Sequence, residues 1–333
     1  FLVVYFKPVC NLLNIRTSIK KQAMKDFEKE VKKGLSNKPK TLPTKYFYDA
    51  KGSELFQEIM DLEEYYLPVC EREIIKNSSN QLAANISSLC NEVDIIGLGA
   101  GDGTKTVELL KAFMPLFQHI DYFPLDISAD ILKVNKENMQ VEIPDLKVKP
   151  VAGNYFISLP KLAFSDKKRL ILFMGANIGN YSPEKAIEFV RFLKENSRTN
   201  DLLLIAFDLK KDPEKILAAY NDKEGVTAKF NMNLLARINN ELNGNFDLNQ
   251  FKHFPTYDPV SGVCKSHLVS LEAQTVSIGD DTYSFKSFEA IQTEVSIKYD
   301  LSEIEKLAEE TGIKLIKHFP DSKNYYTLAL FQV

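Results

Sequence analysis

The chain has 333 residues, of which 44% are hydrophobic and 26% charged, and its formal net charge is −3. This composition is typical of a globular protein with a substantial core, and the length allows two domains. Mixed charge without a basic stripe disfavours nucleic acid as a partner, and no apolar run approaches the roughly 20 residues of a membrane span. We therefore expect a cytoplasmic protein that needs no membrane, and we expect a monomer.

The cysteines and histidines show no ligand pattern. The four histidines stand alone, and no C-x-x-C pair occurs among Cys10, Cys70, Cys90 and Cys264. Neither a disulfide framework nor a metal site is predicted. Residues 1–23 begin with an apolar run that no basic residue precedes, unlike a secretory signal. We treat them as an extension outside the fold, with Met24 as a candidate start residue.

The first clear ligand-binding pattern begins with an apolar strand, VDII, followed by a loop with glycine at every second position and a helix near Thr104. The glycines are Gly97, Gly99, Gly101 and Gly103. Glycine is needed where backbone turns tightly against a ligand, and a helix start presents N–H groups and a positive dipole end. The next apolar stretch, HIDYFPLD, ends in Asp126, whose carboxylate can accept from two ribose hydroxyls. This order predicts a nucleoside-type ligand.

The glycine spacing narrows the ligand class. A phosphate-binding P-loop requires Gly-Lys-Ser/Thr, but Thr104 separates Gly103 from Lys105. The dinucleotide pattern G-x-G-x-x-G fails because the third glycine comes one position early. An ATPase and an NAD-dependent oxidoreductase are therefore disfavoured. The G-x-G-x-G run resembles the first motif of class I S-adenosylmethionine-dependent methyltransferases, which bind an uncharged adenosine and a methionine tail.

Further strands are predicted at Val148 to Val151, Leu170 to Met174 and Leu202 to Phe207, with helical stretches between them. One of these helices has Ser182 as its cap and Pro183 in its first turn. Alternation of this kind is typical of a parallel, doubly wound α/β sheet.

The C-terminal region predicts one more helix and two strands. Ser302 and Glu305 fit a capping box, and Gly312 ends the helix. The strands IKLIKHF and YYTLALFQV follow, and the short link between them can join only antiparallel neighbours. Together the runs predict the seven-stranded, Rossmann-like sheet of a class I methyltransferase.

A different pattern occupies Leu209 to about Ile297. Helical patterns, EKILAAYN and NMNLLARINNELN, precede alternating segments that indicate antiparallel strands, SHLVSLEAQTVSI and YSFKSFEAIQTEVSIKY. An insertion of this length predicts a second, smaller α+β domain. We expect residues 70–208 and 299–333 to bind S-adenosylmethionine and residues 24–69 and 209–298 to bind the substrate.

Six segments resemble, in order, motifs of the L-histidine Nα-methyltransferase family of ergothioneine biosynthesis. They are LPTKYFYDAKGSELFQEIMDLEEYYLP, GLGAGDGTKT, FPLDIS, FMGANIGNYSP, AAYNDKEGVTAKFNMNLLARIN and TEVSIKY. The resemblance extends from about Leu42 to the C-terminus. It implies transfer of three methyl groups from S-adenosylmethionine to the α-amine of histidine, giving hercynine. The sequence leaves open two alternatives: the same chemistry on another aromatic amino acid or amine such as tryptophan, and non-catalytic binding of S-adenosylmethionine and an amino acid.

By position, the resemblance implies a cofactor site without metal, formed by Gly99, Gly101, Lys105, Asp126, Asn154 and Tyr155. It implies an amino-acid site formed by Tyr65, Asn180, Tyr220, Glu294, Val295 and Ser296. The residue types fit these roles. An amide oxygen at Asn154 can accept from adenine, and Tyr155 offers an aromatic face. Glu294 and Ser296 lie two apart in a strand pattern and can hold both imidazole nitrogens.

Tyr65, Tyr220 and Asn180 can donate to a substrate carboxylate. For catalysis, we expect Tyr48 or Asn180 to orient the amine. Taken singly, such residues also have ordinary structural roles: the tyrosines can pack, Asp126 can cap a helix, and Asn180 can form an Asx turn.

Three departures from the family pattern stand out. Gly97 replaces an acid that usually supports the methionine moiety, and Asn154 replaces a frequent Asp. Ser266 and His267 replace a larger apolar pair near the substrate ring. These departures predict a lowered affinity for the cofactor and leave the identity of the acceptor open.

Overall fold

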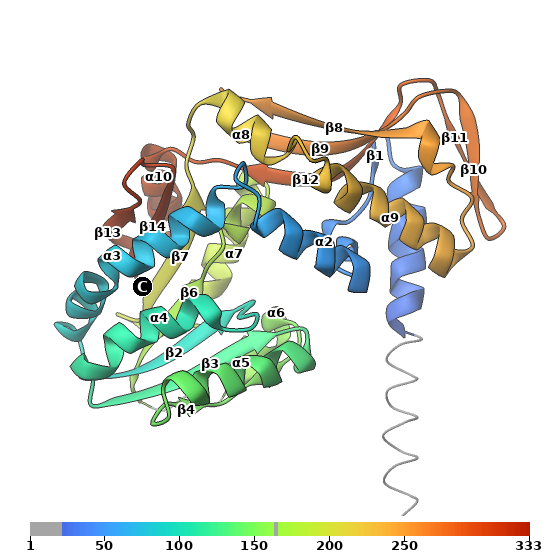
Figure 1. Cartoon of the computed structure of the whole chain (residues 1–333). Coiled ribbons are helices and arrows are strands. Elements are labelled where there is room, and N and C mark those ends of the chain that lie inside the picture. The colour runs from blue at the N-terminus through green and yellow to red at the C-terminus, as the bar shows by residue number, and fades with distance from the viewer. Residues whose placement is uncertain (1–21, 163–165) are drawn as a thin grey trace, which may run out of the picture. The chain divides into compact units, whose positions relative to one another are not determined.

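The computed structural model describes residues 22–162 and 166–333 (Figure 1). They divide into two compact units. The larger unit comprises Tyr66–Asp212, Pro259–Val263 and Ser296–Val333. The smaller unit comprises the described part of Phe1–Tyr65 together with Pro213–Asp258 and Cys264–Val295. Of the predicted N-terminal extension, residues 1–21 lie outside the described residues, and residues 22 and 23 belong to a helix at 22–36.

The described part of the larger unit contains an eight-stranded sheet with the order β13-β14-β7-β6-β2-β3-β4, in which β5 also pairs with β3. Strands β2 to β7 pair in parallel, whereas β14 is antiparallel to β7 and to β13. The bounds are β2 Glu92–Leu98, β3 His119–Asp126, β4 Lys147–Val148, β5 Val151–Ala152, β6 Lys168–Phe173, β7 Leu202–Asp208, β13 Lys314–Pro320 and β14 Tyr326–Gln332.

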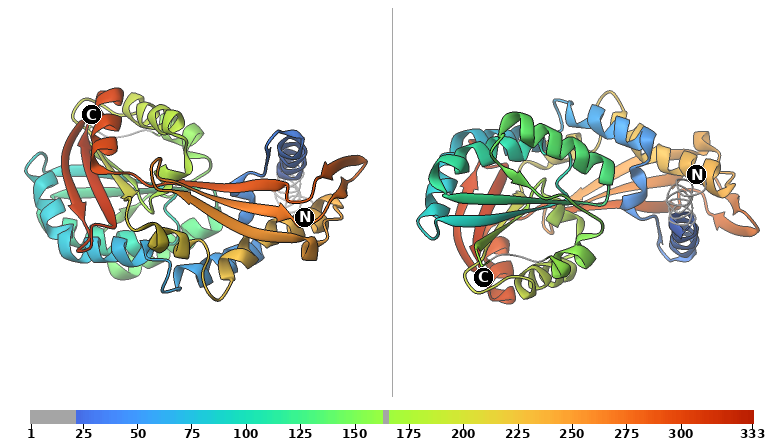
Figure 2. Two further views of the ribbon diagram at one scale, coloured as in Figure 1. Left: turned by 90° about the horizontal axis from the view of Figure 1, so that it is seen from above. Right: turned by 90° about the horizontal axis from the view of Figure 1, so that it is seen from below.

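Helices cover both faces of this sheet. Figure 2 shows α3 and α4 on one face and α7 and α10 on the other. Strand β7 is buried along its whole length, as expected for a central strand covered on both faces. The bounds are α3 Leu67–Ser87, α4 Thr104–Phe113, α5 Ala129–Glu142, α6 Tyr155–Ser158, α7 Pro183–Glu195 and α10 Leu301–Thr311, with 3-10 turns η2 Met114–Leu116, η3 Leu159–Lys161 and η4 Asn177–Asn180.

The predicted doubly wound sheet with an antiparallel end is confirmed, and the Ser182 hydroxyl caps α7 as expected. The predicted single strand Val148 to Val151 is wrong. Lys149 and Pro150 interrupt it, so that β4 pairs with the middle of β3 and β5 with its end. Proline has no N–H for a ladder, which explains the break and the eighth strand.

The predicted capping box of Ser302 and Glu305 is also wrong. The helix begins at Leu301, and the box is formed by Asp300 and Glu303, whose side chains accept from each other's backbone N–H at 2.9 and 2.8 Å. Ser302 instead donates its hydroxyl to the Asp300 carboxylate. Asp300 with Glu303 and Ser302 with Glu305 both have the spacing of a capping box. The first pair forms the box because Tyr299 still pairs with the end of β7, so the helix begins directly after Asp300.

The described part of the smaller unit contains a four-stranded sheet of order β1-β12-β9-β8 and a hairpin, β10-β11. The hairpin is antiparallel as predicted, but β1 pairs with β12 in parallel. The sequence pattern did not predict β1 or β8. The bounds are α2 Ala50–Met60, α8 Pro213–Ala219, α9 Val226–Leu242, β1 Lys40–Thr41, β8 Phe251–Asp258, β9 Val263–Ser270, β10 Gln274–Ile278, β11 Asp281–Phe285 and β12 Ala290–Ile297, with turns η1 Thr44–Phe47 and η5 Leu248–Gln250.

The smaller unit has its own hydrophobic core. The helix at 22–36 contributes Phe27, Val31 and Leu35, which share one face because they are four residues apart. Side chains of α2, α9 and the strands complete the cluster. The guanidinium of Arg237 lies 4.7 Å from the Phe27 ring centroid. This apolar cluster gives the smaller unit a packed interior of its own.

His253 on β8 makes the stability of the smaller unit sensitive to pH. Its side chain is 6% exposed, neither ring nitrogen has a hydrogen-bond partner among the described residues, and burial lowers its pKa to about 4. The charge of Asp222 partly opposes this shift, and that of His267 adds to it. The unfolded chain takes up this proton near pH 6.5, whereas the folded protein does not. The free energy of unfolding should therefore fall by about 2 kcal/mol between pH 7.5 and 5 from this group.

Urea denaturation at both pH values measures this effect. His253→Leu removes the titrating ring, so its unfolding free energy should depend less on pH than that of the unmodified protein. Equal pH dependence in the two proteins would contradict the role of His253.

Candidate active site

The glycine loop after β2 borders open space at Gly99 and Gly101. Gly99 and Gly101 have φ of +63° and +55°, a region that favours glycine. A Cβ atom at either position would meet no other atom within 4 Å. The loop is nevertheless fixed, because Ala100 N–H donates to Leu125 O and Asn135 Nδ2 donates to Gly101 O, both at 3.0 Å. The loop therefore presents fixed backbone to open space.

Asp126 ends β3 beside this loop. Its Oδ2 accepts from Gly101 N at 3.1 Å, and its Oδ1 accepts from Ser128 N at 3.0 Å. Ser128, not Asp126, caps α5, so the capping alternative for Asp126 is wrong. The carboxylate is half-buried and joins the two strand ends where a ribose is bound in folds of this kind.

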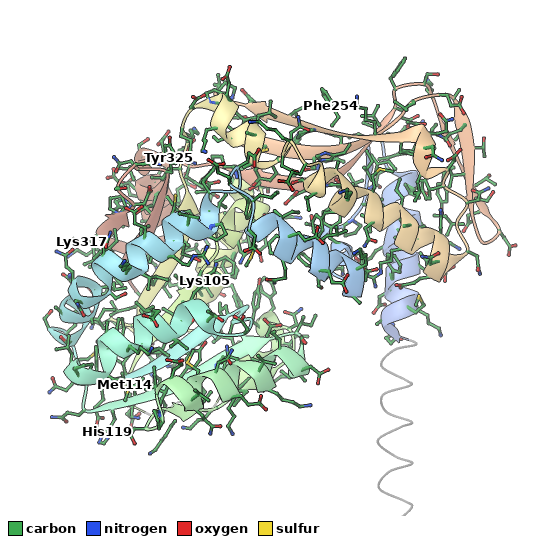
Figure 3. The ribbon with its side chains drawn as sticks, in the orientation of Figure 1. Lys105, Met114, His119, Phe254, Lys317 and Tyr325 are labelled. Atoms are coloured by element: carbon green, nitrogen blue, oxygen red, sulfur yellow. The ribbon has the colours of Figure 1, made fainter. Side chains whose placement is uncertain are left out.

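Lys105 lies in the first turn of α4 (Figure 3). Its Nζ lies 2.6 Å from Oε2 of Glu71, a residue of α3. The Glu71 side chain is 1% exposed and that of Lys105 is 33% exposed. A buried carboxylate thus holds a partly exposed ammonium beside the glycine loop.

Asn154 and Tyr155 follow β5, and both make structural contacts. Asn154 caps α6, with its Oδ1 accepting from Phe156 N at 2.9 Å; an amide oxygen has a second lone pair for another donor. The Tyr155 hydroxyl bonds to that of Tyr181 at 2.8 Å, and its ring lies 6.0 Å from that of Phe189. The pKa of Tyr155 is raised, chiefly by burial and to a smaller extent by the bond to Tyr181. Tyr155 therefore offers a ligand its ring more readily than its hydroxyl.

Asn180 is exposed at the end of η4, after β6. The preceding Gly179 lies against β12: a Cβ there would be 2.6 Å from Ile297 O. Only glycine allows this close approach. The structure therefore brings the turn that carries Asn180 next to the end of β12, where Ser296 lies.

Ser296 contacts a buried group of charges. Lys298 Nζ donates to Ser296 Oγ at 2.8 Å and lies 2.7 Å from Asp208 Oδ2, while Lys211 Nζ lies 2.5 Å from Asp208 Oδ1. The Tyr66 hydroxyl donates to both oxygens of Asp208. Burial alone would raise the pKa of Asp208, but Lys298 and Lys211 hold it below its usual range. The Asp208 carboxylate is therefore held in its charged form between the two ammonium groups at the end of β7.

In the smaller unit, Tyr48 and Glu294 share one neighbourhood. The Tyr48 ring lies edge-on to Phe56 at 5.4 Å and to Phe230 at 5.7 Å, although its side chain is 49% exposed. Desolvation, then the charge of Glu294, raises the pKa of Tyr48. Ser266, a buried residue of β9, donates its hydroxyl to Glu294 Oε2 at 3.2 Å. The phenol of Tyr48 is therefore neutral at physiological pH.

The other predicted residues of the smaller unit are less exposed. Tyr65 is half-buried, with its ring edge-on to Phe56 at 6.4 Å, so Tyr48 and Tyr65 contact the same aromatic ring. Tyr220 is 6% exposed at the end of α8. Val295 follows Glu294 on β12 and is half-buried.

Gly97, where the family usually has an acid, lies directly against the side chain of Tyr122. A Cβ at this position would lie 3.0 Å from the Tyr122 hydroxyl oxygen. Tyr122 is fully buried, and burial raises its pKa to about 12. The phenol therefore fills the space beside position 97, and an acid there would require Tyr122 to move.

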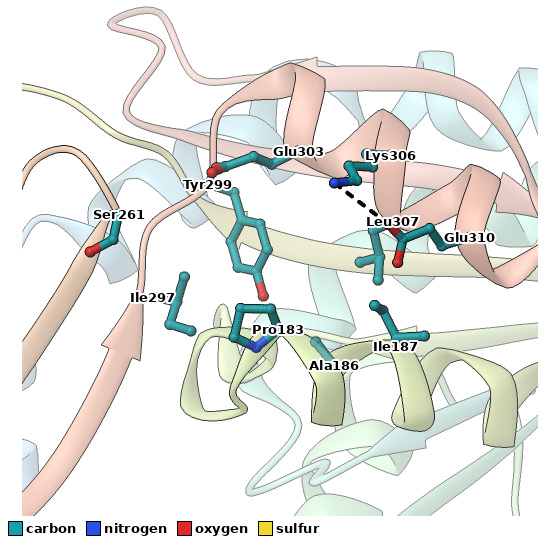
Figure 4. A pocket seen from close by; sticks show the side chains of 10 residues that line it. All are labelled: Pro183, Ala186, Ile187, Ser261, Ile297, Tyr299, Glu303, Lys306, Leu307 and Glu310. Carbon is teal, nitrogen blue, oxygen red and sulfur yellow. Dashed lines mark ion pairs between the residues drawn. The ribbon is translucent and has the colours of Figure 1, made fainter.

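A separate cavity of about 210 Å³ lies in the larger unit between α7 and α10 (Figure 4). An ion pair of 3.7 Å between Lys306 and Glu310 borders it. Its lining is Pro183, Ala186, Ile187, Ser261, Ile297, Tyr299, Glu303, Lys306, Leu307 and Glu310. This lining includes no residue that the sequence predicted for the cofactor or amino-acid site.

Within residues 22–162 and 166–333, no three His, Cys, Asp or Glu side chains are grouped so as to hold a metal ion. The same part of the chain has no helix that is both long and apolar enough to cross a bilayer.

The doubly wound sheet, with a glycine loop after β2, a carboxylate at the end of β3 and the antiparallel β14 beside β7, is the fold of the class I, S-adenosylmethionine-dependent methyltransferases; the loop and the carboxylate also occur in dinucleotide-binding folds. A family model narrows this class: residues 27–333 match histidine-specific, S-adenosylmethionine-dependent methyltransferases. The chain belongs to this family.

Named relatives agree with the family. The chain is 33% identical to histidine N-alpha-methyltransferase of Mycobacterium tuberculosis, over 91% of this chain and 94% of that protein. It is 32% identical to ergothioneine biosynthesis protein 1 of Schizosaccharomyces pombe, over 84% of this chain and 37% of that protein. It is 29% identical to 4-dimethylallyltryptophan N-methyltransferase of Claviceps fusiformis, over 64% of this chain and 61% of that protein.

Three residues that bond to predicted site residues were not predicted for the site from the sequence. Glu71 bonds to Lys105, Ser266 to Glu294 and Lys298 to Ser296. Ser266 was noted only as a departure from the family, and the other two were not singled out. The first two contacts join residues 34 and 28 positions apart, so no local pattern marks them.

Proposed function

We propose that the chain transfers three methyl groups from S-adenosylmethionine to the α-amino nitrogen of L-histidine, giving hercynine. The observation that carries this proposal is the match of residues 27–333 to the histidine-specific family. The open glycine loop bonded to Asp126 supports it. In this proposal the larger unit binds the cofactor, and the smaller unit supplies most of the residues for the amino acid.

The larger unit has the groups that S-adenosylmethionine requires. Gly99 and Gly101 leave room for the ligand, and Asp126 accepts from the ribose hydroxyls. Lys105 binds the carboxylate of the methionine moiety, while Asn154 and Tyr155 hold the adenine. When bound, the cofactor supplies an electrophilic methyl group. The task of these residues is to position it and to exclude water.

Glu294 and Ser296 are proposed to distinguish the imidazole ring. Both lie on β12 two residues apart, so their side chains leave the same face of the strand. An ammonium only donates, so the bond from Lys298 leaves the Ser296 hydroxyl hydrogen to donate to a ring nitrogen. Glu294 accepts from the other ring N–H. Tyr65, Tyr220 and Asn180 donate to the substrate carboxylate. The Val295 side chain leaves the opposite face of β12, so this residue borders the ring through its backbone.

The amine must lose a proton before it attacks, because an α-amino group has a pKa of about 8. The Tyr48 phenol is partly exposed and close enough to Glu294 to sense its charge, so in this proposal it orients the amine while solvent takes the proton. Asn180 is the second candidate for this role.

Tyr48→Phe should lower kcat for histidine methylation by about tenfold or more, because one oriented hydrogen bond to the amine is lost. Steady-state kinetics between pH 7 and 9 provide the measurement. Tyr46→Phe is the matched control, since Tyr46 lies in the same turn and its ring packs on Phe27. Full turnover of Tyr48→Phe across this range would remove Tyr48 from the mechanism.

A second candidate acceptor is an aromatic amine related to tryptophan. The similarity to the Claviceps fusiformis enzyme favours it. Comparing kcat/KM for histidine, tryptophan and tyrosine separates these acceptors. Histidine should be preferred, and a preference for tryptophan would replace the proposal. Calorimetric binding of both ligands without methyl transfer would instead indicate a binding protein.

A further inference from the structure

Glu71 is a fully buried carboxylate that three separate elements contact. Its Oε2 accepts a hydrogen bond of 2.6 Å from Lys105 Nζ on α4. Its Oε1 accepts two hydrogen bonds of 2.7 Å, one from the backbone N–H of Gly175 after β6 and one from the Tyr326 hydroxyl on β14. All four residues belong to the larger unit. The two oxygens therefore have different partners: one holds the ammonium at the glycine loop, and the other holds backbone and a phenol.

The position of Lys105 is unfavourable for the fold alone. It lies in the first turn of α4, where the helix dipole disfavours a cation. Burying the opposite charge on Glu71 also costs free energy that the ion pair recovers only with good geometry. An arrangement of this kind keeps a cation beside the loop where Gly99 and Gly101 face open space. An ammonium has three donors, so the bond to Glu71 leaves donors for an anionic ligand.

The other carboxylate oxygen of Glu71, Oε1, holds the turn that leads to Asn180, a residue proposed for the amino-acid site. Gly175 begins the turn after β6, and that turn continues into η4, which ends at Asn180. One side chain thus fixes both the ammonium beside the glycine loop and the start of the segment that carries Asn180.

We propose that Glu71 is a positioning residue, which fixes the Lys105 ammonium for the carboxylate of the methionine moiety and anchors the turn leading to Asn180. This inference rests on the proposed function. Glu71 itself touches neither ligand. Its contribution to cofactor binding, made through Lys105, should therefore appear only with ligands that carry the amino-acid tail.

The test compares two ligands by calorimetry. S-adenosylhomocysteine carries the tail with its carboxylate, and 5′-methylthioadenosine lacks it. Glu71→Gln keeps an oxygen for Gly175 and Tyr326 but presents an amide N–H₂ to Lys105. This variant should bind S-adenosylhomocysteine at least tenfold more weakly and 5′-methylthioadenosine within twofold of the unmodified protein. Lys105→Gln should show the same selective loss, and combining the two substitutions should add little.

Tyr326→Phe is the matched control, because it removes a donor from the same carboxylate without touching Lys105. Its affinity for both ligands should stay within twofold. Glu71→Asp keeps the charge and decides the case if Glu71→Gln does not fold. A smaller but still tail-selective loss in Glu71→Asp supports the proposal.

Equal losses for both ligands in the Glu71 variants, or no loss, would overturn it. A tail-selective loss in Tyr326→Phe as large as that in Glu71→Gln would do the same. If the unmodified protein bound neither ligand, the proposed function would be overturned as well. This outcome differs from failure of the Glu71 proposal because it is seen before any residue is substituted.

Discussion

Asp126→Asn should weaken binding of S-adenosylmethionine by about 30- to 100-fold. Gly101 N–H and Ser128 N–H hold the carboxylate in place, and we propose that it accepts from the two ribose hydroxyls. Hydrogen bonds to a charged group contribute about 1.5–3 kcal/mol each, and a neutral amide retains part of this. The amide oxygen can still accept from Gly101, so the loop should keep its conformation.

Calorimetric titration with S-adenosylhomocysteine measures this loss. Asp130→Asn is a suitable control, because Asp130 lies nearby in the first turn of α5 and pairs only with the exposed Lys133 among the contacts described. Its affinity should match that of the unmodified protein. A loss below threefold in Asp126→Asn would show that the ribose is bound elsewhere.

Glu294→Ala should lower kcat/KM for histidine by about 100-fold, chiefly through KM. A carboxylate opposite an imidazole N–H contributes about 3 kcal/mol of binding, and a site built for a ring donor discriminates strongly against ligands that lack one. The substitution also enlarges the site. Turnover of tryptophan relative to histidine should therefore increase.

Initial rates at varied histidine and tryptophan concentrations test this expectation. Glu289→Gln serves as the control: Glu289 lies near the start of β12 but pairs with Lys40, so its loss should affect stability and leave selectivity unchanged. Histidine kinetics that are unchanged in Glu294→Ala would remove Glu294 from the substrate site.

Local patterns in the sequence were sufficient for most of the larger unit. Apolar runs separated by helical stretches predict a parallel sheet, and the glycines before Thr104 predict the loop that the structure contains. The errors arose where two local patterns competed. Asp300 and Ser302 both precede a glutamate by three residues, and only the pairing of Tyr299 with β7 selects Asp300 as the cap.

The smaller unit was predicted less completely. Helices α8 and α9 and the hairpin follow from periodicity. Strand β1 has only two residues, however, and its Lys40 pairs in parallel with Ile291 of β12, 251 positions further along the chain. No local signal specifies such a pairing, because strand order depends on the packing of the whole unit.

Some residues of the candidate site could likewise be predicted from the sequence, whereas others are recognised only from the fold. The loop and Asp126 are close in sequence and were predicted from it. Glu71 lies 34 residues from Lys105 and 255 from Tyr326, so its role emerges only from the fold. The close approach of the Tyr122 phenol to Gly97 likewise depends on the fold, because the two residues lie on the adjacent strands β3 and β2.

Methyl transfer to the α-nitrogen of histidine can be tested by identifying the reaction products. The purified protein would be incubated with histidine and S-adenosylmethionine that carries a deuterated methyl group, and the products fragmented in a mass spectrometer. We predict hercynine with three labelled methyl groups, all on the α-nitrogen. Unmodified histidine, or label on the imidazole ring, would contradict the account.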